Sequence, residues 1–101
     1  IVGWTATEVW LQKNTELAKR VVGVLAQSAT WANAYPKESA QILSPYLKIP
    51  AEQIESVPRA VFDDHPRMSP SLLQPVIDAA VKYGILGRSM PAANLIWQGS
   101  A

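Results

Sequence analysis

The sequence predicts a mainly helical chain, with about five helices and one short strand at the N-terminus. Three observations predict this fold class. Apolar residues recur every three or four positions over long stretches, residues that start helices precede those stretches, and Ile1–Thr5 (IVGWT) is a brief run rich in β-branched and aromatic residues. A lone strand leaves its backbone groups unpaired, so we expect it to pair with a segment outside this sequence.

Two helices are predicted directly after this strand. Thr7 to Lys13 (TEVWLQK) predicts about two turns, and Asn14 then interrupts the pattern and is expected to cap the next helix. That next helix, from about Thr15 to Ala34, has the clearest apolar stripe in the chain. The stripe consists of Leu17, Val21, Val24, Leu25, Ser28, Trp31, Ala32 and Tyr35.

Prolines mark the remaining helices. Pro36 suits the first position of a third helix, and Pro45 is expected to kink or shorten that helix. A short fourth helix is predicted over 51–56, because the next proline follows closely. The last helix is predicted over 70–83, with Gly84 in the left-handed conformation that ends many helices.

Size and composition predict one small globular domain. The chain has 101 residues and a mass of 11.0 kDa, with 49% hydrophobic and 17% charged residues. It begins at Ile1 without an initiator methionine or a signal segment, so we expect a processed product, a truncated product or a proteolytic fragment. The resemblance described below ranks the fragment first. We therefore predict a single incomplete domain over residues 1–101, of which residues 87–101 form a polar tail.

The charge and the apolar surface limit the expected partners. A formal net charge of +1 gives no reason to expect nucleic acid or an anionic membrane. Helices around an incomplete core leave apolar surface exposed, including some of the four tryptophans. We therefore expect self-association through this surface.

Few residues in the chain can carry chemistry. Cysteine is absent, which excludes disulfides, thiolate zinc sites and cysteine nucleophiles. The single His65 lies in a polar turn, Asp63 to Arg67 (DDHPR), after an extended stretch from Arg59 to Phe62, and it lacks the spacing of zinc or calcium motifs. We predict no catalytic residue, no metal and no cofactor. Trp4 is the one ligand-binding candidate, because it lies at a strand-to-helix junction, where open α/β sheets place ligands.

Four stretches of the sequence resemble one protein family. They are ELAKR at 16–20, WANAYPKESAQILSPYLKIPAEQI at 31–54, MSPSLLQPVIDAAVKYGIL at 68–86 and AANLI at 92–96. Together they resemble the C-terminal portion of periplasmic solute-binding proteins of the nitrate/sulfonate/taurine type, which include thiamine-pyrimidine receptors and serve ABC importers. The resemblance covers Trp4 to Ile96. Thr15 departs from it, because the family commonly has proline there.

The resemblance implies a fold and a function for this chain. The fold would be the C-terminal part of a two-lobe α/β binding protein, located in the periplasm or elsewhere outside the cytoplasm. The protein would capture a small organic anion (sulfonate, taurine or nitrate) or a thiamine-related pyrimidine by hinge closure and deliver it to an ABC permease. Most ligand contacts in the family come from segments that would precede Ile1, and only Trp4 would lie near the hinge.

Two other functions remain open at this stage. The chain is expected to be either such a receptor portion or a stand-alone helical module whose apolar stripe binds a partner helix. An enzyme is the third interpretation, because a related branch of the family makes the thiamine pyrimidine. That activity would need a catalytic histidine and other reactive groups, which the sequence does not show.

Overall fold

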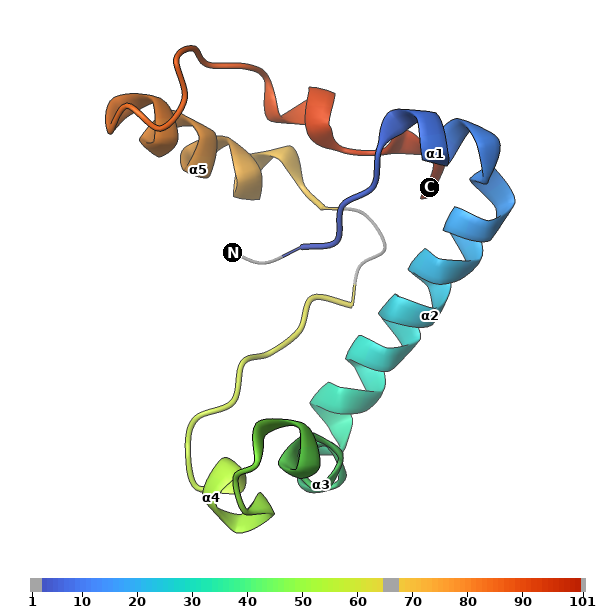
Figure 1. Ribbon diagram of the computed structural model, residues 1–101, viewed down its shortest axis with the longest axis vertical. Helices are drawn as coiled ribbons and strands as arrows, with labels where there is room; N and C mark the ends of the chain where they lie inside the picture. The colour runs from blue at the N-terminus through green and yellow to red at the C-terminus, as the bar shows by residue number, and fades with distance from the viewer. Residues whose placement is uncertain (1–2, 65–67, 101) are drawn as a thin grey trace. The chain divides into compact units, whose positions relative to one another are not determined.

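The computed structural model describes residues 3–64 and 68–100, and all of the regular structure in these ranges is helical (Figure 1). The chain divides into two compact units, Ile1–Val22 with His65–Ala101 and Gly23–Asp64, so that the second helix contributes to both. The elements are α1 (Glu8–Lys13), α2 (Thr15–Ala34), α3 (Pro36–Leu47), α4 (Ala51–Glu55), α5 (Pro70–Lys82) and two 3₁₀ helices, η1 (Ala92–Leu95) and η2 (Gln98–Ser100).

The predicted strand and the predicted α/β architecture are both wrong. Residues 3–7 form an irregular segment that leads into α1, and none of the described residues is in a strand. A strand forms only where a neighbour accepts and donates its backbone hydrogen bonds, and the described part of this chain has no such neighbour. The described residues make a small helical chain, which does not fit a two-lobe α/β fold.

The helices themselves lie where the sequence predicted them. Each helix end that was predicted falls within one residue of the observed end. Thr7 begins α1 as its N-cap, and its hydroxyl oxygen accepts a hydrogen bond from the N–H of Trp10 at 3.2 Å. Asn14 was expected to cap α2, but its side-chain amide instead donates to the Trp10 carbonyl at 3.0 Å and ends α1. Pro45 was expected to kink or shorten α3, and the helix continues past it to Leu47. Pro45 removes one hydrogen bond, which its N–H would have donated to the Gln41 carbonyl.

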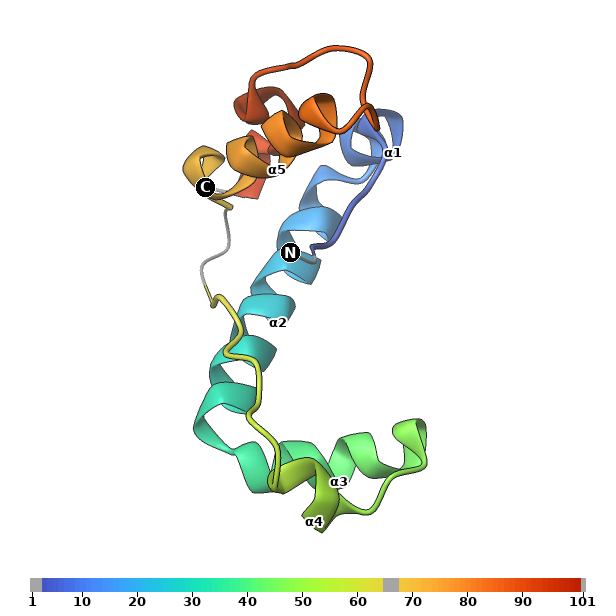
Figure 2. The ribbon, with the colours of Figure 1, turned by 90° about the vertical axis from the view of Figure 1, so that its left-hand side faces the viewer.

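The unit Gly23–Asp64 is built on the packing of α3 against α4 (Figure 2). Ala40 on α3 is fully buried and Ile54 on α4 is 6% exposed, and together they form the small apolar core of this unit. Lys48 ends α3 in the left-handed conformation, with φ of 55°, which turns the chain back towards α4. The side chain of Arg59 donates to the carbonyl of Pro36 at 3.3 Å and to Oγ of Ser39 at 3.0 Å.

An asparagine on α2 holds the extended segment that follows α4. Nδ2 of Asn33 donates to the Phe62 carbonyl at 2.7 Å, and the Phe62 N–H donates back to Oδ1 of Asn33 at 2.9 Å. One turn earlier on α2, the Thr30 hydroxyl donates to Oδ2 of Asp64 at 3.2 Å. Both backbone groups of Phe62 are therefore satisfied by a single helix side chain.

In the other unit, α5 ends as the sequence predicted. Gly84 has φ of 75°, which is a conformation that glycine adopts without a steric penalty. The Ile85 N–H donates to the Ala80 carbonyl at 2.8 Å and the Gly84 N–H donates to the Val81 carbonyl at 3.1 Å. These two bonds make a Schellman motif, which satisfies carbonyls that the end of the helix would otherwise leave free.

A glutamine on α5 holds the segment after that turn. Nε2 of Gln74 donates to the Met90 carbonyl at 3.1 Å and to Oδ1 of Asp78 at 3.0 Å. Its Oε1 accepts a hydrogen bond from the Ala92 N–H at 2.7 Å. Ala92 is buried together with Ile77 of α5, so the glutamine satisfies a backbone donor that water does not reach.

Replacement of Gln74 by alanine is expected to destabilise the protein by about 1–3 kcal/mol, because it leaves the Ala92 N–H and the Met90 carbonyl without their partner. Urea unfolding followed by far-UV circular dichroism measures the change. Gln12→Ala on exposed α1 is the matched control, and we expect it to shift stability by less than about 0.5 kcal/mol. Equal effects of the two substitutions would contradict the role given to Gln74.

Candidate functional site

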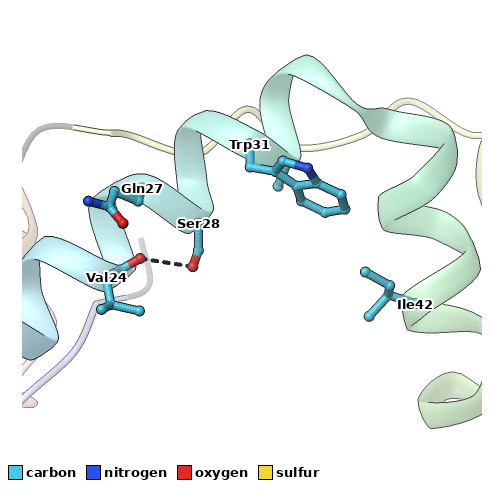
Figure 3. A pocket seen from close by; sticks show the side chains of 6 residues that line it. Val24, Gln27, Ser28, Trp31 and Ile42 are labelled. Carbon is cyan, nitrogen blue, oxygen red and sulfur yellow. Dashed lines mark hydrogen bonds between the residues drawn. The ribbon is translucent and has the colours of Figure 1, made fainter.

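An open concave surface lies between α2 and α3 in the unit Gly23–Asp64 (Figure 3). It is an open hollow of about 480 Å³, within the size range of small-molecule sites. It is lined by Val24, Gln27, Ser28, Trp31, Ala32 and Ile42, none of which is charged.

The side chains that line the hollow come from two helices. Trp31 and Val24 project from α2, and Ile42 faces them from α3 (Figure 3). Trp31 is 40% exposed, Ile42 is 55% exposed and Val24 is 60% exposed, so a large apolar area faces solvent here. Contiguous apolar surface of this kind commonly marks a contact site for another molecule.

The polar groups of the hollow are few. The Ser28 hydroxyl donates to the Val24 carbonyl at 2.8 Å, so its proton is engaged within α2. Gln27 supplies the one side-chain amide of the lining. The Trp31 ring also stacks on the Tyr35 ring with 5.7 Å between centroids, a geometry that fixes the orientation of the indole. The hollow therefore suits an uncharged, largely apolar occupant.

A second, smaller hollow of about 190 Å³ lies at the start of α3. Pro36, Lys37, Glu55 and Arg59 line it. Although two cations lie here, the Arg59 guanidinium is already bound to the Pro36 carbonyl and to Ser39, and Glu55 adds a negative charge. This hollow therefore forms where Arg59 attaches the extended segment to α3.

The predicted ligand residue, Trp4, lies outside both hollows. Its side chain is 84% exposed on the irregular segment before α1, so the strand-to-helix junction that suggested a ligand role is not present among the described residues. His65 lies outside the described residues. Within the described ranges, no three histidine, cysteine, aspartate or glutamate side chains gather as metal ligands would. No described helix is both long enough and apolar enough to span a membrane.

The α2 side of the hollow was predicted from the sequence, and the α3 side was not. Val24, Ser28, Trp31 and Ala32 belong to the predicted apolar stripe, whose 3.6-residue period is visible in the sequence. Ile42 lies in the third predicted helix, for which no apolar stripe was assigned. Its place opposite Trp31 depends on the turn at Tyr35, which no periodicity reveals.

Comparison with known proteins gives no relative for this chain. No family model, no curated protein and no solved structure matches it.

Acrylamide quenching of tryptophan fluorescence is expected to separate Trp4 from Trp31. Trp4→Phe should lower the average quenching constant, because it removes the tryptophan that is 84% exposed. Trp31→Phe should raise that constant, because it removes an indole that is 40% exposed and stacked on Tyr35. If both variants change the constant in the same direction, the placement of these two side chains is contradicted.

Proposed function

We propose that this chain is a helical, supporting part of the solute-binding protein of an ABC importer. The proposal rests first on the resemblance of four stretches of the sequence to the nitrate/sulfonate/taurine-type receptors. The solute would be a small organic anion or a thiamine-related pyrimidine, and the receptor would deliver it to an ABC permease from a periplasmic or other extracytoplasmic location. The chain would have no catalytic role.

The supporting role is inferred from the apolar surface that stays exposed on the helices of this chain. Val24, Trp31 and Ile42 are each at least 40% exposed, whereas the buried apolar residues of the same unit are Ala40 and Ile54. Burial of apolar surface is the main driving force of folding, so a core of this size needs further cover. A larger protein that packs against these helices would supply that cover.

The described hollows do not suit the anionic solutes of such receptors. The lining of the larger hollow is uncharged, and the cations of the smaller one are balanced or already bonded. Anion sites usually present several free charged or backbone donors. The proposal therefore assigns the solute contacts to other parts of the receptor.

A stand-alone helical interaction module is the second candidate function. The observation that favours it is again the hollow between α2 and α3, whose apolar lining fits the non-polar face of a partner helix. This alternative requires a chain that is stable by itself and has no role in solute capture.

The test compares the natural polypeptide with the isolated chain. An antibody raised against the 101 residues should recover the natural polypeptide from the osmotic-shock fluid of its cells. We expect that polypeptide to be stabilised by one of taurine, alkanesulfonates, nitrate or thiamine pyrimidines. A ligand at 100 times its dissociation constant adds about 2.7 kcal/mol, enough to raise the melting temperature by several degrees.

The isolated chain is the control for this experiment. We expect no melting shift with any of these solutes, because the contacts would lie elsewhere in the receptor. Recovery of the natural polypeptide from the cytoplasm, or the absence of a shift with every solute, would contradict the receptor proposal. A two-state melt of the isolated chain in that case would favour the interaction module.

A further inference from the structure

The middle of α2 contains a run of residues that stabilise a helix only weakly. It covers residues 21–24, where three valines surround a glycine, and it lies halfway along a helix of 20 residues. In an α-helix β-branched side chains lose rotamer freedom, and glycine loses more backbone freedom than any other residue. The neighbouring stretches, ELAKR at 16–20 and LAQ at 25–27, consist of strong helix formers. The sequence therefore makes residues 21–24 the weak turn of α2.

The glycine of the weak turn is not required by the packing around it. A β-carbon at Gly23 would meet no atom within 4 Å apart from the backbone of α2 itself. Among the described glycines only Gly84 has a positive φ, so Gly23 does not hold a conformation that alanine would avoid. Alanine would therefore fit at this position and would stabilise the helix.

Little else in the described residues supports the weak turn. Val21 is 45% exposed and Val24 is 60% exposed. Close packing between the described helices joins α3 with α4 and α5 with η1, and α2 belongs to neither pair. The Ser28 hydroxyl also donates to the Val24 carbonyl at 2.8 Å, and a bond of this kind weakens and often bends a helix. Because helices in proteins gain most of their stability from packing, this turn is the part of α2 that opens most readily.

The weak turn also lies where one compact unit gives way to the other. The boundary between the units falls in α2 between Val22 and Gly23. The part of α2 before this point belongs to the unit of α5 and η1, and the part after it belongs to the unit of α3 and α4. Opening of the helix at this turn therefore leaves the packing within each unit intact.

We propose that the weak turn is a hinge, at which α2 opens, bends and re-forms reversibly. Figure 1 draws α2 as one continuous helix, which is the closed form of the hinge. In the open form the hydrogen bonds across this turn are lost, and the free φ and ψ of Gly23 absorb the change in direction. Each unit moves with its own half of the helix. The hinge does not depend on the proposed function, because a receptor part and an independent module would both contain it.

Hydrogen exchange followed by NMR tests where α2 opens. After correction for intrinsic rates, the amides of residues 23–27 should exchange at least about fivefold faster than those of residues 29–32 in the same helix. Gly23→Ala should slow the faster group by about fivefold, the factor that the helix propensities of glycine and alanine give. Gly87→Ala is the matched control, because Gly87 also has open space around it but lies outside the helices, and it should leave exchange in α2 unchanged. Equal exchange of the two groups of amides, or equal effects of the two substitutions, overturns the proposal.

Distance measurements test the bending itself, and Gly23→Ala is expected to fold because it strengthens the helix. The chain has no cysteine, so Arg20→Cys and Ala34→Cys place two spin labels at exposed positions on either side of the weak turn. In a straight helix these two backbone positions are about 21 Å apart, at 1.5 Å per residue. Double electron–electron resonance should show a broad distribution with additional shorter distances, which Gly23→Ala narrows towards the value of the straight helix. A single narrow distance with Gly23 in place overturns the hinge.

Discussion

Each unit of this protein depends on a helix side-chain amide that bonds to the backbone of a non-helical segment. Asn33 on α2 pairs with Phe62, and Gln74 on α5 pairs with Met90 and Ala92. Backbone groups that leave a helix must find partners elsewhere, and sheets usually provide them. The described residues form no sheet. In each unit a side-chain carboxamide, which has both a donor and an acceptor, bonds to these backbone groups instead. These bonds help to hold the non-helical segments against their helices.

The bonds of Gln74 also bear on the proline that follows it inside α5. Pro75 lacks an N–H and therefore weakens the hydrogen bonding of α5 near its start, yet the helix continues to Lys82. Two bonds of Gln74, to Met90 and Ala92, hold this turn of the helix to the segment that follows its far end.

The helices could be predicted closely from the sequence, because their signals are local. Pro36 and Pro70 start helices and Gly84 ends one in the left-handed conformation, each by a preference of the residue itself. The strand was predicted wrongly for the same reason. A β-branched run such as that at Ile1–Thr5 indicates a strand only if a partner exists, and a local pattern contains no information about partners.

The hollow between α2 and α3 could be predicted only in part. Trp31 belongs to a stripe that periodicity identifies, but whether such a stripe is covered depends on contacts between distant residues. The pairing of Asn33 with Phe62 was not predicted, because a single asparagine near the end of a helix resembles an ordinary polar surface residue. Arg59 was likewise placed only in an extended stretch, although its bonds to Pro36 and Ser39 attach that stretch to α3. Hydrogen bonds between residues far apart in the chain produce no recognisable pattern in the sequence.

The amide at Asn33 also makes the protein sensitive to chemical ageing. Asparagine is among the residues that are lost most readily at high temperature, and its deamidation turns the amide into a carboxylate. The new side chain would accept the Phe62 N–H as before, but it would place an oxygen where Nδ2 now donates to the Phe62 carbonyl. Two acceptors would then face each other at 2.7 Å, and the attachment of the segment to α2 would weaken. Deamidation of Asn33 would thus slowly weaken the attachment of this segment, without any cut in the chain.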